Sequence, residues 1–186
     1  MKQSVLMKRI AGCVNLAVSG DLIIYRNCSP KYATEKDLLS GEGSKKVGGR
    51  WNPVGIAAVY GCLDLETVLA EFQRRSQYSQ IPPYRLLPRT LVSIQAELQC
   101  MLPLINGGIR QRIGVSKEKM ITSDWMTKSL GYEGSLTQNI GLASYEAGFE
   151  AILVPSSSRK QGVNLVIFPD NIRKGSNIDI INVERL

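Results

Sequence analysis

The sequence contains no histidine among its 186 residues. This absence excludes Ser-His-Asp and Cys-His catalysis, metal sites with histidine ligands, and a histidine-based pH switch within the chain. If the protein is an enzyme, its chemistry must therefore use carboxylate, hydroxyl, phenol and guanidinium groups.

Long apolar runs, aromatic residues and paired cysteines are also scarce. No stretch approaches the roughly 20 apolar residues that cross a membrane, so we expect no membrane association. Aromatic residues make up only 6 % of the chain, which gives little support for a stacking surface that binds single-stranded nucleic acid. Without histidine, a zinc site would need all four scattered cysteines: Cys13, Cys28, Cys62 and Cys100. We expect a cytoplasmic protein with reduced cysteines and no metal.

The length fits one domain, residues 1–186, with a core large enough to fold without disulfides. The 23 Lys and Arg residues outnumber the 16 Asp and Glu residues, giving a net charge of +7. The excess is +5 over residues 1–60 (nine basic, four acidic) and +3 over residues 61–120 (eight basic, five acidic). Such a surface suits a phosphate-bearing ligand or an acidic partner, although a modest solvated basic surface explains the charge equally well.

Short strands and helices follow one another without regular alternation, which favours an α+β fold over a doubly wound one. Period-2 and β-branched patterns predict strands at residues 22–26, 56–60, 90–98, 150–154, 163–168 and 178–183. Helices are predicted over residues 65–75 after Asp64, from Ser135 to about Ala147, and from Ser123 to a point before Gly131. Residues 27–50 are predicted as a long loop, and residues 103–119 as turns.

Three places depart from ordinary secondary structure. In the segment Gly48–Pro53, glycines precede Arg50, so the backbone can approach a ligand closely while the guanidinium binds phosphate oxygens. Glu71 lies at the border of the apolar stripe of the helix at 65–75, where a carboxylate can face a cleft; the stripe is Leu65, Val68, Leu69 and Phe72. Ser156 follows the strand at 150–154, where a hydroxyl is well placed to hydrogen-bond a ligand.

Each of these features also has an ordinary structural explanation. Arg50 can be a surface arginine in a Gly-rich turn, and Glu71 can be a rim glutamate paired with Arg74 or Arg75. Ser-rich turns such as the one after Pro155 are common. None of the three features identifies a function by itself.

Together, however, the segments resemble the RES domain family, which is named for its Arg, Glu and Ser residues. The resemblance spans roughly residues 22–172. It rests on Tyr25-Arg26, GGRWNPVGIAAVY (48–60), Glu71, TQNIGLASYEAGFEAILVPSSS (137–158) and VNLVIFP (163–169).

The resemblance implies a fold similar to that of ADP-ribosyltransferases, with a mixed β core of short strands and flanking helices. It also implies the toxin of a type II toxin–antitoxin pair. Members of the family cleave NAD by hydrolysis or phosphorolysis, or transfer ADP-ribose to a protein. NAD would be the substrate and no metal would be needed. An Xre-type antitoxin would be the partner, so that DNA is contacted only through it; a homodimer is a further expectation.

Carried over by motif, the resemblance assigns catalytic roles to Glu71, Arg50 and Tyr60. Arg26, Arg50, Tyr60 and Ser156 would bind NAD, the arginines at the pyrophosphate and Tyr60 at the nicotinamide ring. Nicotinamide leaves as a neutral base, so no general acid is needed, and the useful group is a carboxylate that stabilises the ribosyl cation. This chemistry is compatible with a chain that has no histidine.

Alternatives remain at two positions and for the function itself. Glu66 lies on the same predicted helix as Glu71, and Ser157 and Ser158 compete with Ser156. The isoelectric point of about 9.3 keeps a ribonuclease or a nucleic-acid-binding toxin open as a second function. A binding module without catalytic activity is a third.

Overall fold

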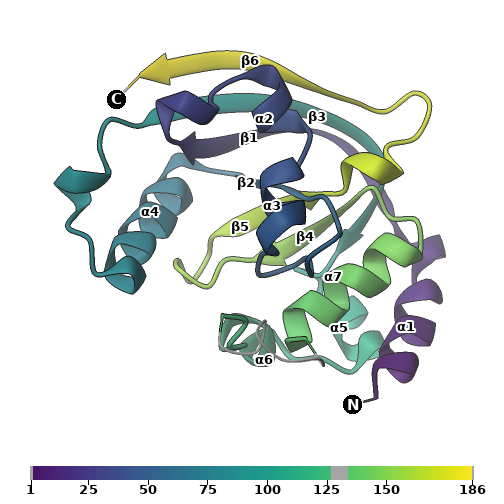
Figure 1. Ribbon diagram of the computed structural model, residues 1–186. Helices are drawn as coiled ribbons and strands as arrows, with labels where there is room; N and C mark the ends of the chain where they lie inside the picture. The colour runs from purple at the N-terminus through teal and green to yellow at the C-terminus, as the bar shows by residue number, and fades with distance from the viewer. Residues whose placement is uncertain (1, 127–133, 186) are drawn as a thin grey trace.

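The computed structural model describes residues 2–126 and 134–185. Its strands form one six-stranded sheet: β1 (Val18–Cys28), β2 (Val59–Cys62), β3 (Thr90–Pro103), β4 (Ala151–Pro155), β5 (Val163–Ile167) and β6 (Asn177–Arg185). The helices of the described residues are α1 (Gln3–Ala11), α2 (Glu35–Leu39), α3 (Glu42–Val47), α4 (Leu65–Ser79), α5 (Gly107–Ile113), α6 (Lys117–Ile121) and α7 (Leu136–Glu146). Figure 1 shows α1, α5, α6 and α7 gathered on one side, away from α4. The mixed α+β fold expected from the sequence is confirmed.

The strand pairings run in a ring that is closed at one weak point. β1 pairs antiparallel with β3 over residues 90–101, and the end of β3, residues 101–103, pairs in parallel with β4. The order continues from β4 through β5 to β2 by antiparallel pairing. β2 returns to β1 at a single residue pair, Tyr25 and Cys62. Helix α4 lies beside this junction and contacts both β1 and β2 (Figure 1).

The core lies on both faces of the sheet. One hydrophobic cluster joins the sheet to α1, α5, α6 and α7 and includes Trp51 and Phe149; the other lies against α2 and includes Ile24 and Leu38. The alternation predicted over residues 90–98 is correct, since Val92, Ile94, Ala96 and Leu98 are all buried.

Helix α4 begins where the sequence predicts. The Asp64 side chain caps it, accepting hydrogen bonds from the backbone N–H of Thr67 at 2.7 Å and from the Thr67 hydroxyl at 2.9 Å. The apolar stripe is only partly correct, however: Val68 is buried, but Leu65 and Leu69 are about half exposed. Only part of the apolar surface of the helix covers the junction of β1 and β2. The spacing of apolar residues in the sequence therefore predicts more buried residues than the helix has.

Helix α7 also matches its predicted start. Ser135 and Gln138 form a reciprocal capping box, and Gly148 follows the helix with a φ of 78°. A helix was predicted from Ser123 to a point before Gly131; residues 123–126 are not helical, and the rest of the prediction lies outside the described residues.

Two segments predicted as loop or turns contain short helices. Residues 27–50 include α2 and α3, and residues 103–119 include α5 and the start of α6. α2, α5 and α6 are capped by the side chains of Thr34, Asn106 and Ser116. Helices of five to seven residues carry too few periodic positions to be recognised. α2, α5 and α6 each bury at least one apolar residue, whereas α3 buries none.

Candidate active site

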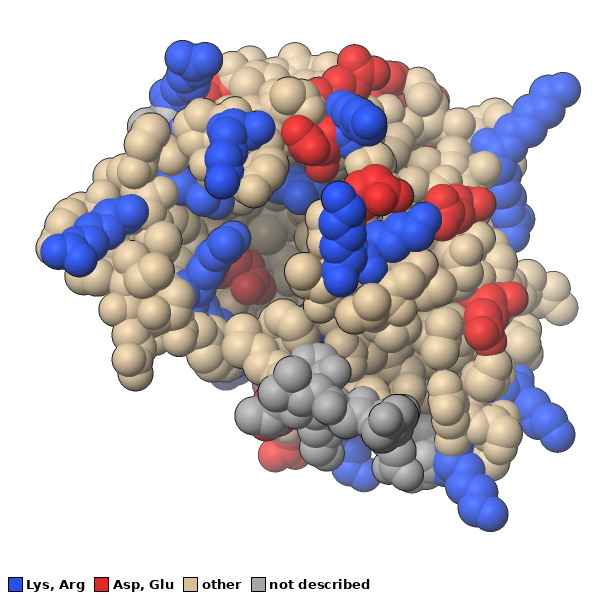
Figure 2. All heavy atoms as spheres, viewed as in Figure 1, with Lys and Arg blue, Asp and Glu red and all other residues tan. Residues whose placement is uncertain are grey.

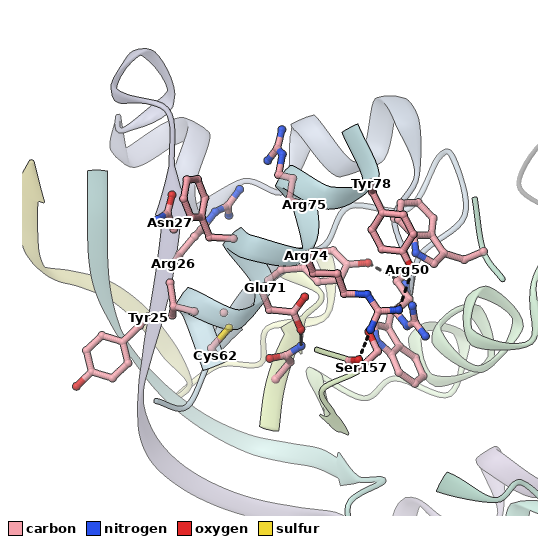
Figure 3. Close-up of a pocket in the computed structure, with 18 of the residues that line it drawn as sticks. Tyr25, Arg26, Asn27, Arg50, Cys62, Glu71, Arg74, Arg75, Tyr78 and Ser157 are labelled. Carbon is pink, nitrogen blue, oxygen red and sulfur yellow. Dashed lines mark hydrogen bonds between the residues drawn. The ribbon is translucent and has the colours of Figure 1, made fainter. Parts of the chain in front are cut away.

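A pocket of about 740 Å³ occupies the space at the junction of β1, β2 and α4. Its charged lining residues are the glutamate Glu71 and five arginines: Arg26, Arg50, Arg74, Arg75 and Arg89. Figure 2 shows this face hollowed, with basic side chains around the opening and an acidic side chain inside it. In Figure 3, Glu71 lies between Arg26 and Arg75 on one side and Arg50 and Arg74 on the other. The pocket is therefore suited to an anionic ligand that also carries a cationic centre.

Glu71 is held from behind by two side chains. Its Oε1 accepts hydrogen bonds from the Ser156 hydroxyl at 2.7 Å and from the Asn164 amide at 3.0 Å. The Ser156 oxygen in turn accepts the backbone N–H groups of Ser158 and Arg159, so its single proton is directed to Glu71. Oε2 makes no hydrogen bond to the described residues, and one carboxylate oxygen therefore stays available to a ligand.

The two candidate glutamates on α4 lie in different surroundings. Glu66 is exposed and forms an ion pair with Arg159 at 3.0 Å, whereas Glu71 faces the pocket and forms no ion pair among the described residues. Arg159 also pairs with the capping residue Asp64 at 3.3 Å, which fastens the Ser-rich loop to the start of α4. This contact holds Ser156 next to Glu71.

The three candidate serines also differ in their burial and in the groups that they contact. Ser156 is almost fully buried and contacts Glu71. Ser157 lines the pocket, and its backbone carbonyl accepts a hydrogen bond from Arg74. The hydroxyl of Ser158 is buried and has no hydrogen-bond partner in the described part of the chain.

The turn that presents Arg50 is built around Asn52 and Tyr60. Asn52 is fully buried, and its side-chain oxygen accepts a 2.6 Å hydrogen bond from the Tyr60 hydroxyl. The same hydroxyl accepts the backbone N–H of Trp51 at 2.9 Å. A side chain at Gly49 would place its Cβ 2.6 Å from both the Tyr60 hydroxyl oxygen and the Asn52 side-chain oxygen, so only glycine fits.

Arg50 itself leaves this turn and reaches the end of α6. Its Nη2 donates to the carbonyls of Met120, at 3.0 Å, and Ile121, at 2.6 Å. Burial lowers the pKa of Arg50, and the positive charge of Arg74 lowers it further, while Glu71 raises it. Because the ordinary arginine pKa is far above neutral, the guanidinium keeps its charge.

At the other side of the pocket, Arg26 and Arg89 also donate hydrogen bonds to backbone carbonyls. Arg26 donates to the Leu38 carbonyl at 3.0 Å, and Arg89 donates to the Asn27 carbonyl at 3.0 Å and to the Asn27 side chain. Burial lowers the pKa of both arginines, and nearby Arg75 lowers that of Arg89 further. Carbonyl oxygens orient these guanidinium groups without neutralising them, so their charge remains available to an anion.

Tyr60 was expected at the nicotinamide ring of the substrate, but its hydroxyl is used within the protein. Its ring lines the pocket, but its hydroxyl points into the Gly48–Pro53 turn, and burial raises its pKa. Sequence reasoning did not assign several polar lining residues to the site, among them Arg74, Arg75, Tyr78, Arg89 and Asn164. Arg74 and Arg75 follow Glu71 at i+3 and i+4 on α4 and were considered only as its ion-pair partners, a pairing that the structure does not show. No local pattern could have indicated Arg89 and Asn164, which arrive from other parts of the fold.

We expect Tyr60→Phe to destabilise the protein. The change removes the donor to Asn52 and leaves the buried N–H of Trp51 without an acceptor, at a cost of about 1–3 kcal/mol in the free energy of unfolding. Urea denaturation measures it. Tyr84, which is 68 % exposed, supplies the control, and Tyr84→Phe should change stability by less than about 0.5 kcal/mol. Equal effects of the two changes would contradict the role given to the Tyr60 hydroxyl.

The pocket also contains the thiol of Cys62, which we expect to be unreactive. Burial, together with the carboxylates of Glu71 and Asp64, raises the pKa of Cys62 to about 12. At pH 8 only about one thiol in 10⁴ is then ionised, and alkylation requires the thiolate. Mass spectrometry after iodoacetamide treatment should show little labelling of Cys62 in the folded protein and full labelling in urea. Rapid labelling of the folded protein would contradict this environment.

Metal-binding groups and membrane-spanning helices are both absent from the described residues. No group of three or more Cys, Asp and Glu side chains is arranged to hold a metal ion in residues 2–126 and 134–185. Within the same residues, no helix has the length and apolar character needed to span a membrane.

One class of protein combines these features, namely the sheet, the arginine-rich pocket and a glutamate held by a serine. The chain belongs to the RES domain family, whose model matches residues 23–185. The match extends beyond the resemblance predicted from sequence and takes in β6.

Named relatives are found in mycobacteria. Over 143 residues, the chain is 27 % identical to proteins of Mycobacterium tuberculosis and Mycobacterium bovis that are named NAD(+) phosphorylase MbcT. The alignment covers 75 % of this chain and 70 % of each relative. The fold is similar to that in the crystal structure of the M. tuberculosis MbcT–MbcA toxin–antitoxin complex, with a TM-score of 0.79 and 22 % identity. That similarity covers 98 % of this chain and 92 % of the other.

Proposed function

We propose that this chain is a toxin that cleaves the bond between nicotinamide and ribose in NAD. The observation that carries the proposal is a glutamate with one free oxygen in a pocket whose other charged lining residues are all arginines. NAD matches both features, since its pyrophosphate is anionic and its ribosyl carbon becomes cationic as nicotinamide leaves. The mycobacterial relatives, which are named NAD(+) phosphorylases, support the same choice.

In the proposed mechanism, Glu71 stabilises the cation that develops on the ribose. Ser156 and Asn164 hold Oε1, so that Oε2 is already oriented before the substrate arrives. Arg26 and Arg50 bind the pyrophosphate, and the ring of Tyr60 forms part of the wall against which nicotinamide lies. The electron pair of the broken C–N bond stays on nicotinamide, which leaves neutral and needs no proton.

We propose inorganic phosphate as the acceptor of the ADP-ribosyl group. A phosphate oxygen forms the new bond to the ribose carbon while the bond to nicotinamide breaks, and the phosphate proton passes to solvent. The products are nicotinamide and ADP-ribose phosphorylated at that carbon. Water and a protein side chain are the competing acceptors, and product analysis distinguishes all three.

An enzyme that destroys NAD must be silenced in the cell that makes it. We propose an Xre-type antitoxin as the partner, by analogy with the toxin–antitoxin complex whose fold is similar. An acidic segment of the antitoxin would fit the arginine-rich pocket. Co-expression with such an antitoxin should restore growth and NAD levels; arrest that persists beside a bound antitoxin would contradict inhibition by binding.

Incubation of the purified protein with NAD and, separately, with RNA tests the proposed activity. We expect nicotinamide release and intact RNA. RNA degradation with intact NAD would overturn the proposal in favour of a ribonuclease, for which the basic charge is the supporting observation. The absence of both activities would favour a binding module.

A further inference from the structure

A second cavity lies on the far side of Arg74 from the main pocket. Its volume is about 540 Å³, and it is lined by Ala70, Gln73, Arg74, Gln77, Tyr78 and Ser158. Arg74 and Tyr78 line both cavities and therefore form the wall between them. A small ligand in the second cavity would reach this wall without passing through the main pocket.

The wall carries an uncompensated positive charge. Arg74 donates from Nη2 to the Tyr78 hydroxyl at 2.7 Å and from Nη1 to the Ser157 carbonyl, and no carboxylate of the described residues lies within ion-pair distance of it. Arg74 is also close enough to Arg50 to lower the pKa of that residue. Two guanidinium groups that repel each other are stabilised by an anion placed beside them.

A second observation points to a ligand on the outer side of the wall. Ser158 lines the second cavity, and its buried hydroxyl has no hydrogen-bond partner among the described residues. Unsatisfied buried hydroxyls are uncommon in folded proteins. Ser158 follows Ser157, whose carbonyl accepts the hydrogen bond from Arg74, so the unsatisfied hydroxyl belongs to the segment that holds this cation.

We propose that Arg74, assisted by Tyr78, binds the acceptor phosphate, which enters through the second cavity. The proposal rests on the proposed function and adds a separate site for its second substrate. The main pocket is lined by five arginines and one glutamate, a formal charge of +4. NAD has two negative charges on its pyrophosphate and one positive charge on its nicotinamide, so it leaves most of that charge unmatched. A phosphate dianion at Arg74 matches a further part of it.

The position of Arg74 relative to Glu71 also suits the transfer of the ribose carbon to phosphate. Arg74 follows Glu71 by three residues on α4, so the two side chains leave neighbouring points on the helix. We expect a phosphate that passes from the second cavity to the main-pocket side of Arg74 to lie next to the ribose carbon that Glu71 stabilises, where its oxygen can form the new bond as nicotinamide leaves. Because phosphate has its own entrance, it can arrive after NAD has filled the main pocket.

Arg74→Gln and Arg75→Gln provide a matched pair of changes. Both remove one arginine from adjacent positions of α4, but Arg75 does not line the second cavity. Its side chain points in a different direction from that of Arg74 (Figure 3), and its charge lowers the pKa of Arg89. The KM values for phosphate and for NAD are measured for each variant from initial rates of nicotinamide release. Arg74→Lys is the third variant, since it keeps a charge and a donor for Ser157.

For Arg74→Gln we expect the KM for phosphate to rise by about tenfold or more, with the KM for NAD changed by less than about threefold. Arg75→Gln should change the KM for phosphate by less than about threefold, and Arg74→Lys should recover part of the phosphate affinity. An unchanged KM for phosphate in Arg74→Gln, or equal increases for both substrates, would overturn the assignment. Failure of the wild-type protein to release nicotinamide would instead contradict the proposed function itself.

Discussion

Replacing Glu71 with glutamine is expected to reduce nicotinamide release from NAD by at least about 100-fold. The amide keeps the size of the side chain and can still accept the hydrogen bonds of Ser156 and Asn164 at its oxygen. It removes the negative charge that would face the ribosyl cation, so the loss should appear in kcat rather than in the KM for NAD. Initial rates of nicotinamide release, with circular dichroism to verify the fold, measure the effect.

Glu66→Gln is the matched control for this change. Glu66 lies on the same helix, is exposed, and forms an ion pair with Arg159, which keeps its second partner, Asp64. Because exposed ion pairs contribute little, we expect the rate to stay within about threefold of the wild-type value. If Glu71→Gln cleaved NAD as fast as Glu66→Gln, the proposed role of Glu71 would be wrong.

Gly141→Ala is expected to have the largest effect on stability. Gly141 is a buried position of α7, and a Cβ there would lie 1.5 Å from the Trp51 carbonyl oxygen, which is backbone and cannot rotate away. The helix and the Gly48–Pro53 turn would have to separate, at a cost of about 3 kcal/mol or more. Gln138 of the same helix donates to the Gly49 carbonyl at 3.1 Å, so the separation would also displace Arg50.

Thermal and urea denaturation measure the loss, and nicotinamide release reports the displacement of Arg50. Gly43→Ala is the control, because a Cβ at Gly43 in α3 meets no atom within 4 Å. That change should be neutral or stabilising by about 0.5 kcal/mol, as expected for alanine in a helix. A Gly141→Ala variant as stable as Gly43→Ala would show that α7 does not pack against the turn as closely as described.

The predictable parts of the fold are those encoded by neighbouring residues. Asp64 with Thr67, and Ser135 with Gln138, specify helix starts within four residues, and both starts are confirmed. The alternation over residues 90–98 likewise determines which side of β3 is buried. The helices α2 and α5 were missed because their stability depends on burial against the sheet, which a stretch of five to seven residues does not reveal.

Part of the candidate site was also predictable, because several of its residues belong to local sequence motifs. Arg26, Arg50, Tyr60 and Glu71 all line one pocket, and Ser156 contacts Glu71 from behind. Their roles remain predictions. Single-sequence reasoning could not place Arg89 or Asn164, because they reach the pocket only through strand pairing and chain packing. Nor could it show that the hydroxyl of Tyr60 is used by the turn beneath Arg50.

The ³¹P NMR spectrum of the wild-type protein incubated with NAD and inorganic phosphate tests the central claim most directly. We expect the NAD pyrophosphate signals to be replaced by those of the product, which retains the pyrophosphate, together with consumption of phosphate and a new phosphomonoester signal equal in amount to the nicotinamide released. Loss of NAD without phosphate consumption would contradict phosphate as the acceptor. An unchanged NAD spectrum, with the protein folded, would contradict the proposed activity altogether.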